Sequence, residues 1–271
     1  MTSVRPRVRP APVQKWASGR RIGPMPGNRE AVHQAYTESA STYDLLYVGT
    51  GLKDYATEAD EVDHLIRSRN PGAATLLDVG CGTGQHLACL RGRYAVEGVD
   101  VSPEMLAVAR TRLPDVPLHV SDMRRLDLGR EFDAVTCLFS SIGYATDDAE
   151  LHQTVAGLAR HLAPGGVLII DGWIRPDAWQ DRHRPAVEQA DDGETLVVRV
   201  GRSWREGNLT TLEMHHLVCT EGGIRHFSER HLLALVPTDV YVAAVQRAGL
   251  GAEVERDYMP GRDRVIGVRP R

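Results

Sequence analysis

The sequence predicts a doubly wound α/β fold, a parallel sheet with helices on both faces, that carries an antiparallel insertion. Short apolar segments alternate with helix-like segments from residue 75 to residue 171, which is typical of repeated strand–helix units. From residue 195 to residue 236, three long strand-like segments follow one another, joined by the turn sequences Glu-Gly-Asn and Glu-Gly-Gly. We therefore expect a main sheet and a second, antiparallel sheet.

The composition divides the chain into three parts. Residues 1–29 hold seven Lys or Arg, five Pro and no acid, and they are too poor in apolar surface to fold, so we expect a disordered basic tail. We assign residues 30–175 and 236–271 to the α/β domain and residues 176–235 to the antiparallel insertion.

The bulk properties exclude several classes of protein. The formal net charge of −4 gives no reason to expect a nucleic-acid partner. No apolar run approaches the roughly 18 residues needed to cross a bilayer, and the N-terminus has no apolar signal region. The four cysteines lack the spacing of a metal site. We expect a cytoplasmic protein with reduced thiols that contacts no membrane.

Apolar periodicity and end signals place the elements. Helical spacing covers residues 30–70, with an interruption at 43–51, and Ser102 followed by Pro103 marks a helix start. The other expected helices cover residues 85–90, 103–113, 151–162 and 237–249. The expected strands cover residues 75–79, 94–99, 118–120, 132–139, 167–170, 195–204, 208–220, 224–236, 252–258 and 264–268.

The rest of the chain is organised around the glycine loop at residues 76–84, Leu-Leu-Asp-Val-Gly-Cys-Gly-Thr-Gly. Residues without Cβ let the backbone turn sharply and approach a ligand, and the following helix offers free N–H groups. A dinucleotide fingerprint needs Gly or Ala at the sixth position of its motif, where this chain has Gln85 or, in the other frame, Leu87. The loop therefore argues against a dinucleotide oxidoreductase.

Two acids accompany the loop. Asp78 precedes the alternating Gly80, Gly82 and Gly84, and Asp100 closes the next expected strand 22 residues later. This arrangement resembles motif I of the class I S-adenosylmethionine-dependent methyltransferases, which have a Rossmann-like sheet. The resemblance implies that S-adenosylmethionine lies on the loop and that the second acid holds the ribose hydroxyls.

Later segments extend the cofactor site. An acid beside a large apolar side chain, Asp122-Met123, can accept from the adenine amino group while packing on its ring. Phe139 ends the fourth expected strand, where α/β sites lie. Tyr43 and Tyr47 suggest a lid segment whose rings face the cofactor, although they could equally be helix-packing tyrosines.

Further motifs indicate a narrower family. They are Tyr-Asp-Leu-Leu-Tyr at 43–47, Lys-Asp-Tyr at 53–55, Asp-Met-Arg at 122–124, Phe-Ser-Ser-Ile-Gly-Tyr at 139–144, Pro-Gly-Gly at 164–166, Arg-Glu-Gly-Asn at 205–208 and Arg-His-Phe-Ser at 225–228. Over residues 43–268 the chain resembles the N,N-dimethyltransferases that act on TDP-linked amino-deoxysugars such as those making mycaminose and desosamine. The resemblance implies a nucleotide-sugar between the parallel sheet and the insertion. The basic tail and Asp-Gly-Trp-Ile at 171–174 depart from the family pattern.

The substrate is expected to contact residues at the strand ends and in the C-terminal loop. Arg262 matches an arginine of the family's C-terminal loop and offers forked donors for a diphosphate, with Arg175 as a second choice. Trp173 could stack on thymine or serve core packing. The residues expected to bind the substrate are Tyr55, Ser141, Tyr144, Trp173, Arg175 and Arg262.

Methyl transfer to an amine needs a neutral lone pair. The positive sulfonium of the cofactor would lower the pKa of a neighbouring amine, so no single residue need act as a strong base. If a base exists, strand parity with Glu213 and Leu217 favours His215, with His226 next. Tyr47 could orient the amine, as the resemblance implies. No metal site is expected, because adjacent histidines on a strand face opposite sides.

We therefore predict an N-methyltransferase, adding two methyl groups to the amine of a TDP-linked amino-deoxysugar in antibiotic sugar biosynthesis. The first alternative is a class I methyltransferase acting on another small oxygen or carbon acceptor. The second is a non-catalytic module that binds a nucleoside. The long insertion also offers a surface for a homodimer.

Overall fold

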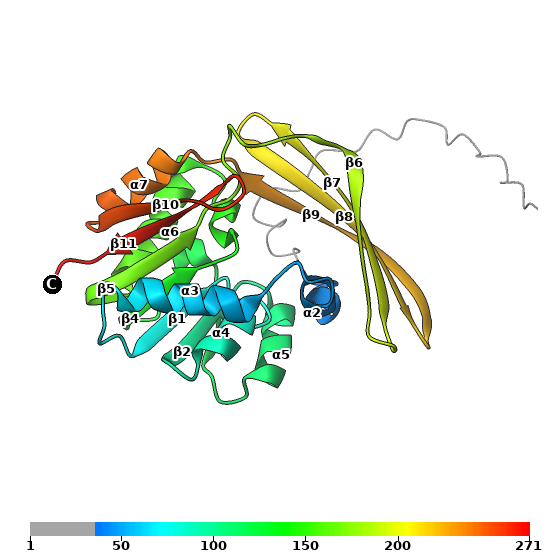
Figure 1. Cartoon of the computed structure of the whole chain (residues 1–271), viewed down its shortest axis with the longest axis horizontal. Coiled ribbons are helices and arrows are strands. Elements are labelled where there is room, and N and C mark those ends of the chain that lie inside the picture. Colours follow the sequence, from blue (N-terminus) through cyan, green and yellow to red (C-terminus); the bar gives the residue numbers. More distant parts are fainter. Residues whose placement is uncertain (1–35) are drawn as a thin grey trace, which may run out of the picture.

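The computed structural model describes residues 36–271, apart from the side chains of residues 182–184, and contains two sheets (Figure 1). The predicted tail of residues 1–29 lies outside the described residues. Seven strands form the main sheet in the order β10-β11-β5-β4-β1-β2-β3, and four form the second in the order β6-β7-β8-β9. The predicted α/β fold with an antiparallel insertion is confirmed.

Five parallel strands make up the centre of the main sheet. They are β1 (Thr75–Val79), β2 (Ala95–Asp100), β3 (Leu118–Val120), β4 (Phe132–Cys137) and β5 (Leu162–Asp171). The chain runs from β1 outward to β3, then returns to β4 beside β1. The strand order therefore reverses between β1 and β4, and a ligand crevice is expected outside their carboxyl ends.

Two antiparallel strands complete this sheet. β11 (Arg262–Val268) pairs with β5, and β10 (Gly251–Met259) lies at the edge. Apolar side chains from both faces form the core: α3, α4 and α5 cover one face, and α6 and α7 cover the other. These helices are α3 (Tyr55–Arg67), α4 (Gln85–Leu90), α5 (Pro103–Arg112), α6 (Asp148–Arg160) and α7 (Thr238–Arg247). Ser102 caps α5 through its side chain, as the sequence predicts.

The second sheet has one strand more than the three long strands predicted. Its strands are β6 (Arg182–Asp191), β7 (Leu196–Glu206), β8 (Leu209–Thr220) and β9 (Gly223–Ala234). β6 lies at the edge, where Pro185 is tolerated because no neighbour needs its missing N–H. Its polar composition hid the strand from hydrophobic periodicity.

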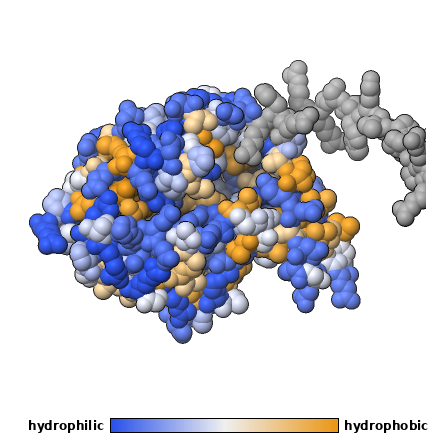
Figure 2. All heavy atoms as spheres, viewed as in Figure 1, coloured by the Kyte–Doolittle hydropathy of each residue, from blue (hydrophilic) through white to orange (hydrophobic). Residues whose placement is uncertain are grey.

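The second sheet has an inner face, which we define as the side that contacts α2 (Ala40–Gly49). Leu46 of α2 packs there against Val197, Val218 and Phe227. The opposite, outer face leaves large apolar residues exposed, among them Val187, Leu217 and Ile224. Hydrophobic residues gather over this sheet in Figure 2.

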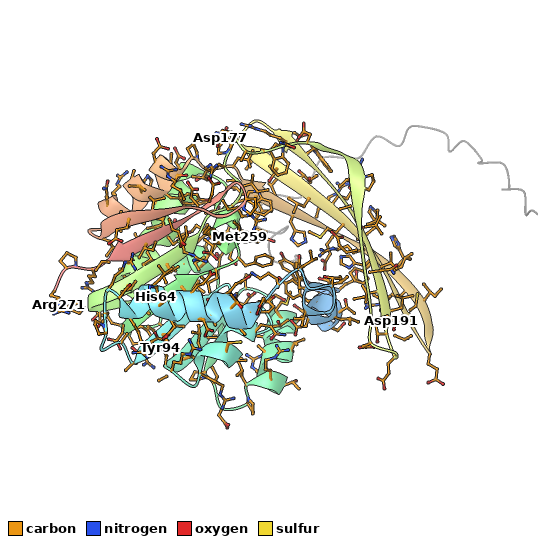
Figure 3. All side chains as sticks on the ribbon, in the orientation of Figure 1. His64, Tyr94, Asp177, Asp191, Met259 and Arg271 are labelled. Atoms are coloured by element: carbon orange, nitrogen blue, oxygen red, sulfur yellow. The ribbon has the colours of Figure 1, made fainter. Side chains whose placement is uncertain are left out.

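The two sheets are joined near Asp177, between β5 and β6, whereas Asp191 lies at the far end of β6 (Figure 3). Side chains from both sheets and from α2 point into the space between them (Figure 3). Two short 3₁₀ helices, η1 (Met123–Arg125) and η2 (Ser141–Tyr144), follow β3 and β4 and face this space.

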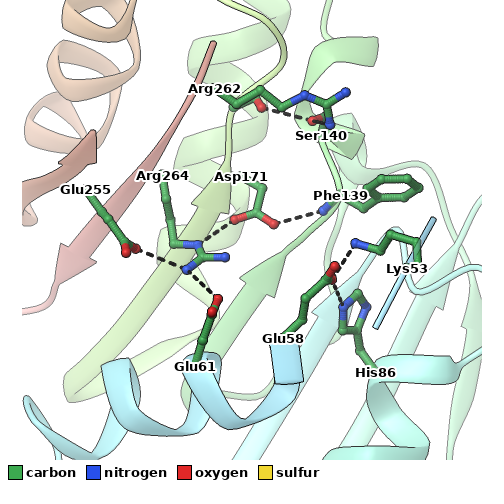
Figure 4. A network of polar contacts seen from close by, with 11 residues as sticks. Lys53, Glu58, Glu61, His86, Phe139, Ser140, Asp171, Glu255, Arg262 and Arg264 are labelled. Atoms are coloured by element: carbon green, nitrogen blue, oxygen red, sulfur yellow. Dashed lines mark hydrogen bonds and ion pairs between the residues drawn. The ribbon is translucent and has the colours of Figure 1, made fainter. Parts of the chain in front are cut away.

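A buried ion pair fixes the strand ends that border this space. Asp171, at the end of β5, accepts from Arg264 Nε of β11 at 2.7 Å and from the backbone N–H of Phe139 at 3.1 Å (Figure 4). The side chains of Asp171 and Arg264 are 5% and 3% exposed. Phe139 and Ser140 both have positive φ, of 50° and 65°, so this bond supports an unfavourable turn.

Asp171→Asn should lower the free energy of unfolding by about 3 kcal/mol, because it leaves the buried Arg264 guanidinium without its nearest carboxylate. Chemical denaturation measures this effect. The exposed Asp115, changed in the same way to Asn, serves as the control and should shift stability by less than about 0.5 kcal/mol. Equal effects of the two substitutions would contradict the assigned importance of the ion pair.

Candidate functional site

A single pocket lies between the carboxyl ends of the parallel strands and the inner face of the second sheet. It encloses about 1310 Å³, its open mouth included. The pocket is open on one side, and its lining comes from both sheets, from α2 and from the loop after β1. The predicted site residues that line it are Tyr43, Tyr55, Gly80, Gly82, Asp100, Asp122, Met123, Phe139, Ser141, Tyr144, Trp173 and Arg262.

The glycine loop connects β1 to α4 and forms one wall. Gly80 and Gly84 have φ of 77°, a conformation that side chains disfavour. A Cβ on Gly80 would lie 2.6 Å from Ser141 Oγ, and one on Gly84 would lie 2.9 Å from Leu113. Gly84 therefore serves the packing of α4 on α5 and does not line the pocket.

The middle glycine, Gly82, faces open space. A Cβ there would meet no protein atom within 4 Å, although Gly82 lines the pocket. A ligand can therefore approach the backbone of the loop closely. This open cradle, with a carboxylate beside it, fits the adenosyl cofactor that the sequence resemblance implies.

Asp100 ends β2 beside the loop and organises it. One carboxylate oxygen accepts from the N–H of Gly82 at 2.8 Å and the other from the N–H of Ser102 at 2.9 Å. Burial raises the pKa of Asp100, while these backbone hydrogen bonds oppose the rise. Each carboxylate oxygen has a further lone pair, which leaves acceptor capacity for two ligand hydroxyls.

Asp78 lies beneath the loop and does not line the pocket. The residue is only 2% exposed, and its carboxylate accepts a hydrogen bond from Thr136 Oγ1 at 2.8 Å. Burial raises the pKa of Asp78. The structure thus places Asp78 as a support of the loop.

Asp122 and Met123 lie at the end of β3, at the adenine side that the sequence predicts. The Arg124 guanidinium binds both Asp122 oxygens, at 2.7–3.0 Å. The side chain of Arg124 is 7% exposed and also donates to Glu150. These bonds hold the Asp122 carboxylate in place at the pocket edge.

Aromatic rings crowd the wall opposite the loop. Tyr43 contacts Tyr36 and Tyr47, with ring centroids 5.6 and 4.4 Å apart. Tyr47 itself does not line the pocket, because it packs on Phe139 and its hydroxyl accepts from Arg199 at 3.0 Å. The structure therefore does not bring Tyr47 to the position expected for orienting an amine.

The two predicted histidines lie outside the pocket. His215 and His226 stack on the outer face, with ring centroids 5.5 Å apart, and both are exposed. The parity argument failed because Glu213 is buried between Arg202 and Arg230 on the outer face, and Leu217 is exposed there. Neither histidine is placed to act as a base on a ligand in the pocket.

Arg262 and Trp173 form the far end of the pocket. The Arg262 guanidinium lies 4.6 Å from the Trp173 ring and donates to Ser140 Oγ at 3.3 Å (Figure 4). Trp173 Nε1 donates to Thr210 Oγ1 of β8 at 3.1 Å, so the indole bridges the two sheets. An arginine beside an exposed ring face suits a nucleotide base and its phosphates.

Arg175 lies apart from the pocket. Its guanidinium donates to Asp257 at 2.8 Å and to Asp263 at 2.6 Å. Asp263 also accepts hydrogen bonds from Thr238, Arg256 and a backbone N–H. Burial alone would raise the pKa of Asp263, but these hydrogen bonds and the one from Arg175 lower it to about 2. The predicted second anchor for the substrate is therefore committed to structural ion pairs.

Several residues in or beside the pocket were not predicted from the sequence. His86 lines the pocket, and its Nε2 contacts the Glu58 carboxylate at 2.9 Å; the buried Lys53 bonds the same carboxylate (Figure 4). Burial lowers the pKa of Lys53, while hydrogen bonds from His86 and Lys53 lower the pKa of Glu58 against the effect of burial. Tyr36 and His231 also line the pocket.

The alternation of residues along β9 could have identified His231 from the sequence. His231 alternates with Phe227 and Glu229 along β9, and all three are buried on the inner face. An alternation that starts from Phe227 would have selected His231.

Residues 36–271 contain no cluster of three or more His, Cys, Asp or Glu side chains that could hold a metal ion. No helix within this range is long and apolar enough to cross a membrane.

Comparison with known proteins identifies relatives. Residues 76–166 match the family model described as a methyltransferase domain. The chain is 45% identical over 233 residues to dTDP-3-amino-3,4,6-trideoxy-alpha-D-glucopyranose N,N-dimethyltransferase of Streptomyces venezuelae, a match that covers 85% of this chain and 98% of that enzyme. It is 39% identical over 233 residues to dTDP-4-amino-2,3,4,6-tetradeoxy-D-glucose N,N-dimethyltransferase of Saccharopolyspora spinosa, covering 86% of this chain and 93% of that enzyme.

A solved structure of a sugar methyltransferase is also similar to this chain. CalS10 of Micromonospora echinaspora, an amino pentose methyltransferase of calicheamicin biosynthesis with S-adenosylmethionine bound, superimposes with a TM-score of 0.75 at 41% identity. The match covers 84% of this chain and 96% of that one. With this identity over nearly the whole of its relatives, the chain belongs to the class I S-adenosylmethionine-dependent N,N-dimethyltransferases of TDP-linked amino-deoxysugars.

Proposed function

We propose that this chain methylates the amine of a TDP-linked 3-amino-deoxysugar twice, in the biosynthesis of a natural product. The 45% identity to the Streptomyces venezuelae 3-amino-sugar enzyme carries this proposal. Methylation of a 4-amino-sugar is the second candidate, because the Saccharopolyspora spinosa enzyme is 39% identical. Residues of both sheets line the pocket, and Arg262 among them offers donors for a diphosphate, which supports a nucleotide-sugar as the acceptor.

We infer that the α/β domain of residues 30–175 and 236–271 binds the cofactor and that residues 176–235 cover the substrate. S-adenosylmethionine supplies an activated methyl group on a positively charged sulfur. Asp100 would accept from the ribose hydroxyls, and Asp122 with Met123 would hold the adenine. Gly80 and Gly82 would let the ligand reach the loop backbone.

The far end of the pocket would hold the nucleotide. Arg262 is assigned to the diphosphate, since it lines the pocket and offers a planar fork of N–H donors. Trp173 would stack on the thymine, with Ser140 and Ser141 beside the phosphates. The sugar amine would then point toward Tyr36, Tyr144 and His231.

We also propose a cytoplasmic location and a homodimer. The four cysteines are free thiols, which supports a reducing, cytoplasmic location. The apolar outer face of the second sheet supports a homodimer, because monomers rarely leave contiguous apolar patches uncovered.

Incubation with TDP-3-amino- and TDP-4-amino-sugars and the cofactor tests the main proposal. Mass spectrometry should find two added methyl groups on the 3-amino-sugar and a lower kcat/KM for the 4-amino-sugar. The reverse preference would assign the chain to 4-amino-sugars. Transfer to neither substrate would retire the aminosugar assignment.

Asp100→Ala should weaken binding of S-adenosylhomocysteine by about 1–3 kcal/mol, or roughly 5- to 150-fold in Kd, because charged hydrogen bonds to the ribose are lost. Titration calorimetry measures this effect. Asp115→Ala, at an exposed site, is the control. An unchanged Kd for Asp100→Ala would remove Asp100 from the ribose site.

Arg262→Ala should raise the KM for the nucleotide-sugar roughly 10- to 100-fold while the KM for the cofactor stays within about twofold. Arg175→Ala is the matched comparison. Because Arg175 is bound to Asp257 and Asp263, its loss should lower the melting temperature and leave both KM values nearly unchanged. Equal effects of Arg262→Ala on the two KM values would place Arg262 outside the substrate site.

Leu217→Asp should dissociate the proposed homodimer, because it introduces a charge into the apolar outer face. Sedimentation velocity measures the change from dimer to monomer. A monomer in the unmodified protein at micromolar concentration would contradict the dimer.

A further inference from the structure

A line of polar side chains leads from the pocket into the second sheet. The Tyr144 hydroxyl, on η2, lies 2.7 Å from Nδ1 of His231 on β9. Nε2 of His231 lies 3.7 Å from Oε2 of Glu229 on the same strand. The side chains of His231 and Glu229 are 1% and 6% exposed, so these groups are shielded from bulk water.

The contacts of Glu229 favour one arrangement of protons. Its two oxygens accept from the N–H and the hydroxyl of Ser39, at 3.2 and 2.9 Å. A carboxylate near Nε2 favours the His231 tautomer that carries its proton on that nitrogen. Nδ1 is then an acceptor, and the Tyr144 hydroxyl donates to it.

Tyr144 cannot act as a base by itself. Burial raises its pKa well above 10, so the phenol stays neutral. Because the Tyr144 proton points to His231, the Tyr36 hydroxyl, whose oxygen lies 3.1 Å from the Tyr144 oxygen, is the donor between the two tyrosines. The Tyr36 ring lies 4.5 Å from the His231 ring. Tyr36, Tyr144 and His231 all line the pocket.

The proposed reaction creates a need for such a group. A sugar amine carries a proton when it is an ammonium, and methyl transfer requires its lone pair to be free. Two successive transfers release two protons in the pocket. A group that takes up one proton for each transfer, away from the sulfonium, would serve both transfers.

We propose that Tyr144, His231 and Glu229 form a relay that removes a proton from the substrate ammonium before each methyl transfer. This inference rests on the proposed function. An ammonium N–H bond breaks as a Tyr144 O–H bond forms, while the original Tyr144 O–H bond breaks and the proton forms an N–H bond at His231 Nδ1. Tyr144 stays neutral throughout, and the nitrogen of the substrate keeps its electron pair. His231 becomes an imidazolium beside the Glu229 carboxylate and holds one proton. That proton returns through Tyr144 to water when the product leaves the pocket, so the relay is neutral again before the next methyl transfer.

The surroundings tolerate this imidazolium. The titratable groups near His231 are Glu229, His216 of β8, Tyr36 and Tyr144, and Arg199 of β7 lies near His216. Burial lowers the pKa of His216 to about 4, so His216 is neutral at pH 7. Arg199 is paired with Glu188 at 3.2 Å. Although burial raises the pKa of Glu229, the neighbouring His231 and the hydrogen bonds from Ser39 lower it, so Glu229 remains charged.

In these roles Tyr144 touches the substrate, whereas His231 and Glu229 act through it as positioning residues. The informative variants are therefore His231→Gln and Glu229→Gln. A glutamine oxygen can still accept from the Tyr144 hydroxyl, but it cannot hold a proton at neutral pH. His64→Gln, on the exposed side of α3, is the matched control.

The experiment measures single-turnover methyl transfer to the TDP-3-amino-sugar from pH 6 to pH 10. At pH 7, His231→Gln should transfer about 10- to 100-fold more slowly than the unmodified protein, within the range of acid–base contributions. The KM for the sugar should change less than threefold. Glu229→Gln should be about tenfold slower, and His64→Gln should equal the unmodified protein.

The pH profile separates the relay from a structural role. Below the pKa of the substrate amine, methyl transfer by the variants depends on the small fraction of substrate whose amine is already neutral. That fraction rises tenfold for each pH unit. The deficit of the variants should therefore shrink as the pH rises and vanish above that pKa. A deficit that is the same at every pH, or no deficit in either variant, would overturn the relay. Binding of S-adenosylhomocysteine with unchanged Kd verifies that both variants are folded.

The unmodified protein distinguishes failure of the relay from failure of the proposed function. If it transfers methyl groups and the variants show no pH-dependent deficit, only the relay is wrong. If it transfers to no TDP-amino-sugar, the proposed function and the relay both fall.

Discussion

The hydrogen bonds between the Asp100 carboxylate and two backbone N–H groups are the constraint on which the site depends. They tie the end of β2 to Gly82 on one side and to Ser102, the cap of α5, on the other. A glycine loop alone is conformationally free, and its positive φ values cost entropy on folding. Anchored by a buried carboxylate, it becomes a fixed wall. The same carboxylate fixes the loop geometry and keeps acceptor capacity on the pocket side.

The second sheet completes the pocket that the parallel sheet begins. Trp173, at the end of β5, bonds Thr210 of β8, and His231 of β9 bonds Tyr144 of η2. These two bonds hold the sheets together at neighbouring points of the pocket wall. The position of the second sheet over the strand ends is therefore fixed by contacts between the sheets. In a reaction that proceeds mainly by alignment, such fixed positioning contributes directly to rate.

The sequence predicted what local patterns determine and missed what long-range packing determines. The parallel strands, the glycine loop and Asp100 follow from periodicity and spacing over short distances. β6 was missed because an edge strand can be polar. Arg175 was misplaced because its partners, Asp257 and Asp263, lie more than 80 residues away in the chain. The histidines were assigned to the wrong face because Glu213, buried by two arginines on the outer face, had been taken to mark the inner one.

The histidines on the two faces of the second sheet differ in their surroundings. On the outer face, His215 and His226 are exposed and close to water, where a histidine titrates freely but touches no ligand. On the inner face, His231 is shielded, faces a carboxylate and bonds a hydroxyl in the pocket. Proton removal must occur where the amine meets the cofactor, yet a charged base there would face a sulfonium of like charge. A neutral tyrosine at the pocket, with the developing charge held behind it beside Glu229, separates the two positive charges. The antiparallel sheet thereby provides acid–base chemistry that the cofactor-binding sheet, with its carboxylates engaged by the loop, does not.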